Sequence, residues 1–411
     1  MARTVKINTP SENVSLLFLF YSFLKIGATS FGGFMALISV VQKKLSGKNR
    51  LITDDVILDG ISLASVLPGP VAFNVIIYIG YTLRGIKGAL VSMLGILLPS
   101  FIFMIVLSMV YVEYGQLPVL TNFFKGVLPS VVAIIVAVAF NMAKKQIKDV
   151  KQIWICLASI VALFLIKSIL STFIIIAAGG LVGYFLYRKS VNREDVVTNK
   201  QTLNRKQLIV FLGLVLGLAL ILVFMPLIVS GSLRQDIIVQ RELMLTFSGI
   251  SVTLFGSGYV IIPAMQEIVV TGLQWLTERE FADSIAMGQL TPGPIFISAT
   301  FIGFKAGGLL GAITSTLSIF VPPMMVMILV SEFFDKIKKS KPIKAAFKGL
   351  RPAVIGMILS AAFTMGKSMS ISWFTVVIFL AVLVASARFK IDVIYLIPIS
   401  GILGILFFNF L

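Results

Sequence analysis

The sequence contains no histidine, a single cysteine and few charged residues. Histidine is the commonest transition-metal ligand and the usual proton carrier near neutral pH, so we expect neither a metal site nor another cofactor. One cysteine, Cys156, excludes an internal disulfide. Only 13% of the 411 residues are charged, whereas soluble domains contain about a quarter. A water-soluble globule is therefore excluded.

Apolar residues dominate what remains. They make up 58% of the chain, and the mean hydropathy is +1.03. The opening "MARTVKINTPSENVS" lacks the apolar core and small-residue cleavage site of a secretory signal, so we expect the first hydrophobic segment to be retained. The composition predicts an all-α polytopic membrane protein. Apolar stretches long enough to approach or cross a bilayer lie at about 14–42, 54–82, 88–112, 119–143, 152–167, 169–187, 207–229, 243–270, 281–304, 307–331, 346–366, 371–387 and 391–411.

An internal repeat organises these segments, because residues near 17–145 recur near 241–368. At an offset of 224 the matches are Phe31-Gly32 with Phe255-Gly256, Gln42 with Gln266, Asp59 with Asp283 and Pro68-Gly69-Pro70 with Pro292-Gly293-Pro294. At an offset of 223 they include Gly80 with Gly303, Gly88 with Gly311, Pro99 with Pro322, Lys125 with Lys348, Pro129 with Pro352 and Lys144 with Lys367. A duplicated unit of four segments with peripheral helices is the internal symmetry of a secondary transporter.

The distribution of positive charge bears on the orientation of the two copies. If the first two segments of each repeat fold back at their Gly and Pro breaks, 27 of the 35 Lys and Arg residues lie on the cytoplasmic side, seven lie outside and Lys25 lies in the membrane. This arrangement satisfies the positive-inside rule and places the repeats in opposite orientations. The alternative is a kinked but fully spanning helix at one break.

We therefore predict two inverted-topology repeats with broken or re-entrant helix hairpins at the Gly-Gly and Pro-Gly-Pro motifs. Four parts are expected: an N-terminal transporter repeat at 1–187, a cytoplasmic polar linker at 188–206, a connecting transmembrane helix at 207–240 and a C-terminal transporter repeat at 241–411. We expect a cytoplasmic N-terminus. Topology explains most of the net charge of +18, so nucleic acid is not an expected partner.

The Pro-Gly-Pro breaks carry the main functional prediction. Proline interrupts a helix, glycine lets the backbone turn, and the second proline suits the first position of a new helix. Such a helix leaves its first N–H groups without intrahelical partners, and an anion is the ligand that this positive end favours. A purely structural kink is the alternative. The residues predicted at these two breaks to bind substrate are Pro68, Gly69, Pro70, Val71, Pro292, Gly293, Pro294 and Ile295, with the N–H groups of Ala72, Phe73, Phe296 and Ile297 beside them.

Glycines and a few polar side chains near the breaks complete the predicted site. For the glycines, close helix packing is an equal alternative, and for the polar residues it is hydrogen bonding between helices. Lys25 either supplies counter-charge or snorkels to an interface. The predicted residues are Gly32 and Gly33 in "SFGGF", Gly256 and Gly258 in "LFGSGY", and Asn74, Ser298, Gln289 and Lys25, with Ser65 also considered.

Carboxylates would have to carry any proton coupling, since histidine is absent. Asp59 and Asp283 align but lie about nine residues before the breaks, so capping or ion pairing is favoured for them over a proton relay. Glu113 and Glu267 are the other candidates. Lys305, at a segment end, is expected to snorkel, and Pro99, Pro129, Pro322 and Pro352 are interpreted as kinks or caps near segment ends.

The motifs resemble a known family. "WLTEREFADSIAMGQLTPGPIFISATFIGFKAGGLLGAITSTLSIFVPP" at 275–323 resembles the C-terminal half of the chromate ion transporter family in its long two-domain form, and "DGISLASVLPGPVAFNVIIYIGYTLRGIKGALVSMLGILLPSF" at 59–101 resembles the N-terminal half. The resemblance implies a bacterial inner-membrane exporter of chromate, working by exchange or driven by the proton motive force, with sulfate as a structural analogue. The chain departs from the family pattern at Phe34, Ser65 and Asn74, whereas Gln289 is retained.

The sequence thus predicts a secondary transporter of a tetrahedral oxyanion, chromate or a sulfate-like ion, in the bacterial inner membrane. Another small anion is the alternative substrate. A membrane-embedded enzyme is disfavoured, because no nucleophile-and-base set or carboxylate pair occurs at motif spacing. The expected partners are the anion and the lipid bilayer. A coupling proton or counter-ion and a second copy of the chain in a homodimer are left open.

Overall fold

The computed structural model describes residues 14–29, 41, 52, 54–64, 67–115, 117–166, 171–189, 205–225, 232–253, 259, 261–331, 341–367, 369 and 371–410. Helices make up almost all of these residues and no strand occurs among them. The prediction of an all-α protein is confirmed. The predicted glycines of the first break in each repeat, Gly32, Gly33, Gly256 and Gly258, and also Ser65, lie outside the described residues.

The helices follow the repeat found in the sequence. The first half contains α1 (Leu16–Thr29), α3 (Asp54–Ala64), α4 (Val71–Tyr114), α5 (Pro118–Gln146), α6 (Val150–Leu165) and α7 (Ser171–Tyr187). After α8 (Arg205–Phe224), the second half contains α9 (Ser232–Thr253), α10 (Ile261–Gln266), the π-helix η4 (Glu267–Gly272), α11 (Glu278–Leu290), the 3-10 helix η5 (Ile295–Ile297), α12 (Ser298–Ser331), α14 (Lys341–Lys367), α15 (Trp373–Ala387) and α16 (Val393–Phe410).

The duplication reaches further than the sequence matches indicated. The starts of α5 and α6 lie 223 residues before those of α14 and α15, and the start of α3 lies 224 before that of α11. The pair α6 and α7 therefore corresponds to α15 and α16, which the sequence analysis treated as peripheral helices. Helix boundaries are repeated there although the residues are not.

The two longest helices each contain a sharp turn at equivalent positions. In α4, Arg84 and Gly85 have φ/ψ of −142°/25° and 59°/−149°, and in α12 Gly307 and Gly308 have −148°/28° and 61°/−152°. The chain folds back at each turn. At the first turn this is shown by Gly88, which lies so close to Gly80 that an added Cβ would overlap the carbonyl oxygen of Gly80. Residues eight apart in a straight helix are about 12 Å apart. Each long helix is therefore a short arm followed by a long second half.

The four prolines predicted as kinks or caps near segment ends lie inside helices instead. Pro99, Pro129, Pro322 and Pro352 lie inside α4, α5, α12 and α14. The non-helical backbone of α4 and α12 is at the Arg84 and Gly307 turns instead. Proline within a helix is tolerated where neighbouring helices stabilise the freed backbone groups.

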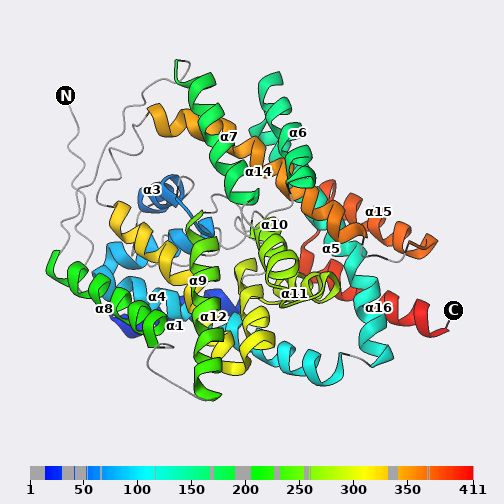
Figure 1. The fold of residues 1–411 in the computed structure, drawn as a ribbon, viewed down its shortest axis with the longest axis horizontal. Coiled ribbons are helices and arrows are strands. Elements are labelled where there is room, and N and C mark those ends of the chain that lie inside the picture. Colours follow the sequence, from blue (N-terminus) through cyan, green and yellow to red (C-terminus); the bar gives the residue numbers. More distant parts are fainter. Residues whose placement is uncertain are drawn as a thin grey trace.

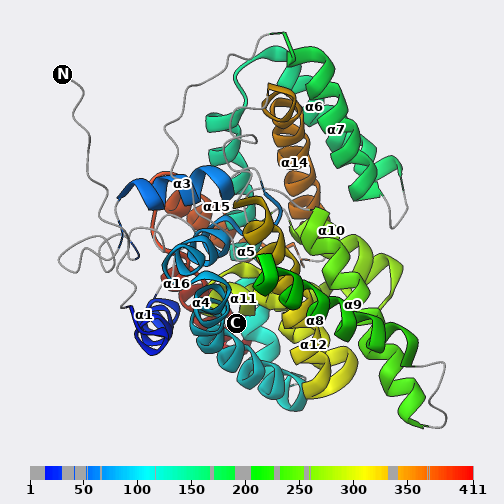
Figure 2. The ribbon, with the colours of Figure 1, turned by 90° about the vertical axis from the view of Figure 1, so that its left-hand side faces the viewer.

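The two halves interlock through these helices. α6 and α7 pack against α14 of the other half, and α15 and α16 pack against α5. Figures 1 and 2 both show α6, α7 and α14 side by side. Glycine allows the close approach: Gly349 of α14 lies against Gly179 and Gly183 of α7, and Gly126 of α5 lies against Gly404 of α16. The same contact is made twice.

The equivalent helices α5 and α14 run antiparallel where they meet. Arg351, in the first part of α14, donates from Nη1 to Oε1 of Gln146 at the end of α5, at 3.0 Å. Gly366, at the end of α14, lies against Val132 in the middle of α5. The end of one helix therefore adjoins the beginning of its counterpart.

Apolar helices with outward-facing hydrophobic side chains identify a multi-pass membrane protein. Four segments are long and apolar enough to cross a bilayer: Val71–Tyr114, Pro118–Gln146, Ile295–Ser331 and Lys341–Lys367. Ile102, Phe103 and Val106 of α4 are each more than half exposed. Such exposed apolar surface is unusual on a soluble monomer and is expected against lipid.

Candidate functional site

The two Pro-Gly-Pro breaks have the same backbone geometry. Gly69 and Gly293 have φ of 94° and 110°, a region that glycine adopts without strain. The prolines that follow them, Pro70 and Pro294, are extended and precede the next helical segment. Pro68 and Pro292 are buried. Each predicted break is therefore a left-handed glycine between two helical arms.

Each break contacts the long helix of the other half in the part that follows its sharp turn. A Cβ added to Gly69 would lie 2.5 Å from the Cβ of Pro323 in α12, and one added to Gly293 would overlap Oγ of Ser100 in α4. Ser100 lies fifteen residues after the Gly85 turn, and Pro323 lies fifteen residues after the Gly308 turn. At about 1.5 Å per residue, both contacts are roughly 22 Å along the second half of a long helix.

The contacts of the two breaks differ in polarity. Ser100 donates a short hydrogen bond from Oγ to the carbonyl oxygen of Pro292. The equivalent position on the other long helix is Pro323, which has no such donor. One break is thus fixed by a hydrogen bond and the other by van der Waals packing.

The helical segments after the breaks also begin differently. In α4 the first bond runs from the Asn74 N–H to the Pro70 carbonyl at 2.9 Å, so the N–H groups of Val71, Ala72 and Phe73 have no intrahelical partner. In the second half, η5 begins with a 3-10 turn in which the Ile297 N–H donates to Pro294 O at 3.0 Å.

The expectation that Ile297 would offer a free N–H is therefore wrong, because the tighter turn uses this group. Ile295 and Phe296 precede that bond and remain as the expected donors of the second break. Neither α4 nor η5 has a side-chain hydrogen bond at its N-cap residue, Pro70 or Pro294.

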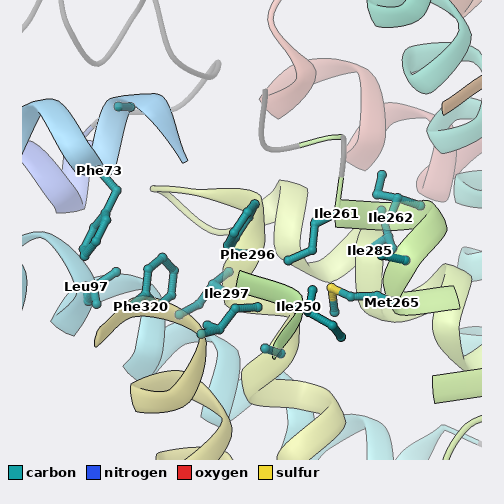
Figure 3. Packing of buried hydrophobic residues seen from close by; sticks show 14 of the residues in the cluster. Phe73, Leu97, Ile250, Ile261, Ile262, Met265, Ile285, Phe296, Ile297 and Phe320 are labelled. Atoms are coloured by element: carbon teal, nitrogen blue, oxygen red, sulfur yellow. The ribbon is translucent and has the colours of Figure 1, made fainter. Parts of the chain in front are cut away.

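Aromatic side chains that closely follow the two breaks pack together. Figure 3 shows Phe73, Phe320 and Phe296 in a row, with Leu97 beside Phe73 and Phe320. The ring of Phe320 is 5.0 Å from that of Phe73 and 6.2 Å from that of Phe296, between centroids. At the offset of 223, Phe73 corresponds to Phe296 and Leu97 to Phe320. The cluster therefore joins equivalent positions of the two halves, and no sequence motif pointed to it.

The predicted polar residues are buried close to the breaks. Asn74 donates from Nδ2 to Pro68 O at 2.8 Å, and Ser298 donates from Oγ to Ile295 O at 3.0 Å. Both side chains are fully buried. Oδ1 of Asn74 and both amide atoms of Gln289 have no hydrogen-bond partner among the described residues. Unpartnered buried amides are rare in native proteins, so Gln289 is the most available polar group at the second break.

Lys25 is the predicted residue that the structure does not bring to the breaks. It lies on α1 with an exposed side chain. α1 packs against α4, where Gly27 touches the backbone of Ile96. Gly27 therefore lies on the buried face of α1, whereas Lys25 lies on its exposed face.

Asp283, for which capping or ion pairing was favoured, and Lys305 both have specific partners. Asp283, which is 2% exposed, accepts from Oη of Tyr111 at 2.7 Å. The Tyr111 ring packs edge-on against Phe124 and Phe301. Lys305, which was expected to snorkel, forms an ion pair with Glu280 at 3.0 Å. These contacts join the start of α11 to the end of α4 and to the arm of α12.

Comparison with known proteins agrees with this architecture. The family model described as "Chromate transporter" matches residues 17–184 and 241–405. The chain is 29% identical to a chromate transport protein of Cupriavidus metallidurans over 90% of its length and 87% of that protein. It is 28% identical to a probable chromate transport protein of Synechococcus elongatus, over 94% of each. An uncharacterized transporter of Methanocaldococcus jannaschii is 29% identical over 88% of this chain and 87% of its own.

No solved structure matches the chain. The family model covers each half separately, with the gap falling on the polar linker and α8. The chain belongs to the chromate transporter family.

Proposed function

We propose that the protein is a secondary active transporter of a tetrahedral oxyanion, chromate or a sulfate-like ion, across the bacterial inner membrane. The observation that carries this proposal is the contact of each Pro-Gly-Pro break with the second part of the other half's long helix. Broken helices at the bilayer midplane, at the interface of two repeats, are where secondary transporters bind substrate.

The breaks are the tips of re-entrant hairpins in this proposal. In the second half, the start of α11 lies near the end of α4, since Asp283 contacts Tyr111. The tip at Gly293 lies near Ser100, eleven residues before Tyr111 on that helix. Phe301, on the returning arm, is again beside Tyr111, with ring centroids 5.1 Å apart. A hairpin that enters, reaches mid-depth and returns to the same side accounts for all three contacts.

Inverted orientation of the two halves follows from the same reasoning. The antiparallel packing of α5 and α14 supports it, because equivalent spanning helices of inverted repeats run in opposite directions. The distribution of Lys and Arg supports it independently. The two hairpins then enter from opposite sides and meet near the midplane.

The anion is bound by backbone N–H groups in this proposal. Val71, Ala72 and Phe73 at one break, and Ile295 and Phe296 at the other, present donors at the positive ends of helical segments. Gln289 adds an amide that has no other partner among the described residues. In this proposal the conformation is closed, because Phe73 and Phe296, which follow the two breaks, both pack against Phe320. Rocking of one half against the other would separate these rings and expose the donors.

Chromate is proposed as substrate because relatives covering most of the chain bear that name. Sulfate has the same tetrahedral shape and charge, and a site built from N–H donors does not distinguish the two strongly. Uptake of labelled chromate and labelled sulfate into proteoliposomes tests the proposal. Saturable uptake that the other anion inhibits supports it. Uptake of neither anion, at any imposed gradient, rejects it.

A further inference from the structure

Positive charge gathers where four helix ends from the two halves meet. These are the end of α5, the start of α6, the end of α7 and the start of α14. Their residues, 144–151, 187–189 and 341–351, contain ten Lys or Arg and a single carboxylate, Asp149. We call these residues the basic junction.

Hydrogen bonds and a ring contact join all four helix ends. The hydrogen bond from Arg351 ties α14 to the end of α5. Nε2 of Gln152, in α6, donates to Lys348 O of α14 at 3.1 Å. The Tyr187 hydroxyl of α7 donates to the Asp149 carboxylate at 2.7 Å, and Nζ of Lys348 lies 5.3 Å from the centre of the Tyr187 ring. The four helix ends therefore form one surface and bring their cations together.

The positive charge of the basic junction is not neutralised by the chain. Asp149 accepts hydrogen bonds from a tyrosine hydroxyl and a backbone N–H, and it forms no ion pair with a described residue. Lys148 and Lys151 are exposed and likewise have no carboxylate partner in the described part of the chain. The flanking segments 190–204 and 332–340 contain five Lys or Arg and four Asp or Glu, so they add no negative charge overall.

The repeat supplies an internal comparison. At the offset of 223, residues 144–151 and 341–351 correspond to 367–374 and 118–128, at the junction where α15 and α16 pack against α5. Those two ranges contain two cations and no carboxylate, whereas the ranges in the basic junction contain eight cations. The same helix packing forms without the charge, so the fold does not require it. The positive-inside rule favours cations on one side of a membrane, but it does not gather them at one junction.

Outward-facing apolar side chains begin directly beside the basic junction. They follow one face of α6 at the helical spacing of three and four residues and are 46–67% exposed. These side chains are Val150, Ile153, Trp154, Leu157 and Val161. Tryptophan is enriched at the level of the lipid headgroups. A molecule bound here meets positive charge at one end and an apolar helix face along its length.

The end of α7 places a further cation beside apolar surface. The guanidinium carbon of Arg188 is 5.9 Å from the centre of the Tyr184 ring and 6.0 Å from that of Phe185. Arg188 is exposed and forms no ion pair with a described residue. Contact with the rings leaves its N–H groups available to an acceptor. Phosphate oxygens are acceptors that Arg and Lys bind well.

We propose that the basic junction binds the headgroup of an anionic phospholipid, with Lys148, Lys151 and Arg188 as its main ligands and the acyl chains lying along α6. Basic surfaces beside membrane helices recognise such headgroups. The adjoining apolar face of α6 selects a lipid over a soluble anion. Because the basic junction joins α6 and α7 of one half to α14 of the other, a bound lipid also holds the two halves together. The lipid site does not depend on which ion the protein transports.

Lipid titration of the purified full-length protein in detergent tests the proposal. Phosphatidylglycerol and phosphatidylcholine with the same acyl chains are added separately, and bound lipids are counted by native mass spectrometry. The wild type should bind its first phosphatidylglycerol at least about tenfold more tightly than phosphatidylcholine. The triple variant Lys148→Gln, Lys151→Gln, Arg188→Gln should bind phosphatidylglycerol about 100-fold more weakly, roughly fivefold for each neutralised cation. Its affinity for phosphatidylcholine should not change.

The matched control removes three exposed cations outside the basic junction: Lys87→Gln, Lys367→Gln, Arg388→Gln. This variant should bind phosphatidylglycerol within about twofold of the wild type, because screening limits the reach of distant surface charges. Equal affinity of the wild type for the two lipids overturns the site. A preference for phosphatidylglycerol that the junction variant keeps, or that both triple variants lose equally, overturns it as well.

A competition arm distinguishes a lipid headgroup from a free anion. Excess inorganic phosphate at constant ionic strength should leave the first phosphatidylglycerol bound, and its displacement by phosphate overturns the lipid site. Phosphatidylglycerol should also raise the melting temperature of the wild type and not that of the junction variant. Should the triple variant fold poorly, Lys148→Gln and Lys151→Gln are tested singly, and each should weaken phosphatidylglycerol binding by about fivefold. Unchanged binding in both single variants overturns the site.

Discussion

The breaks at Gly69 and Gly293 have the same backbone conformation but different side-chain surroundings. Their glycines share a left-handed conformation, and the turns after their arms agree within a few degrees. Their surroundings differ: Pro323 faces one and Ser100 the other. Glycine and proline therefore preserve the fold of both halves, whereas the polar contacts have diverged. The two breaks therefore differ in these contacts and in how α4 and η5 begin.

The largest expected effect comes from adding a side chain at the breaks. Gly69→Ala and Gly293→Ala each introduce a strained φ and an overlap, together costing roughly 2–4 kcal/mol and most of the transport activity. Ser100→Ala should partly rescue Gly293→Ala, because the overlapping atom is Oγ. Pro323→Ala should not rescue Gly69→Ala, because the overlapping atom is Cβ, which alanine keeps. Thermal unfolding in detergent measures the loss of stability, and anion uptake measures the loss of transport activity. Rescue of Gly69→Ala by Pro323→Ala, without rescue of Gly293→Ala by Ser100→Ala, would contradict these contacts.

A second effect tests the interlocking of the halves. Gly183→Ala places a methyl group against the Gly349 backbone and should destabilise the protein by roughly 2–3 kcal/mol. Gly126→Ala, at the equivalent contact with α16, should cost a similar amount. Gly180→Ala is the control on the same helix: nothing lies within 4 Å of its added Cβ, so stability should rise by about 0.5–1 kcal/mol. Equal melting temperatures for the Gly180 and Gly183 variants would show that α7 does not pack on α14 as described.

A third prediction separates a structural amide from a binding one. Asn74→Leu removes the bond to Pro68 O and should cost about 1 kcal/mol or more. Gln289→Leu removes no hydrogen bond to a described residue and should leave the melting temperature unchanged or higher. Its KM for anion uptake should nevertheless rise by about tenfold, the loss of one hydrogen bond to a charged ligand. A Gln289 variant with lower stability and unchanged KM would assign this residue to the fold.

The smallest effect concerns the end of α7 and depends on pH. Burial alone would raise the pKa of Asp149, but hydrogen bonds from Tyr187 Oη and the Gln152 N–H outweigh it and hold the pKa below its ordinary value. A lowered folded-state pKa stabilises the protein above the unfolded-state pKa, and this contribution disappears as pH falls through the folded-state value. Tyr187→Phe should thus cost about 1 kcal/mol at neutral pH and less in acid. Melting temperatures of both proteins across this range measure the difference, and a gap that widens in acid would contradict it.

Much of this architecture could be predicted from one sequence because glycine and proline leave distinct signals. The all-α fold and its apolar segments are confirmed, and a glycine of positive φ stands at each Pro-Gly-Pro motif. The correspondence of α6 and α7 with α15 and α16 escaped detection, since lipid-facing helices tolerate exchange among apolar residues and keep only their length. Contacts between distant segments, such as Ser100 with Pro292 or Tyr111 with Asp283, leave no local pattern. The equivalence of Ser100 and Pro323 becomes meaningful only once both are seen at the breaks.

In the proposed function the two halves are inverted, so that their breaks approach one site from opposite sides of the membrane. Lys87 and Leu310 are equivalent residues just after the two sharp turns, and both are exposed. Each is replaced singly by cysteine in a Cys156→Ala background, and a membrane-impermeant thiol reagent is applied to intact cells and to inside-out vesicles. Inverted halves predict labelling of Lys87→Cys only in inside-out vesicles and of Leu310→Cys only in intact cells. Labelling of both positions from the same side would contradict it.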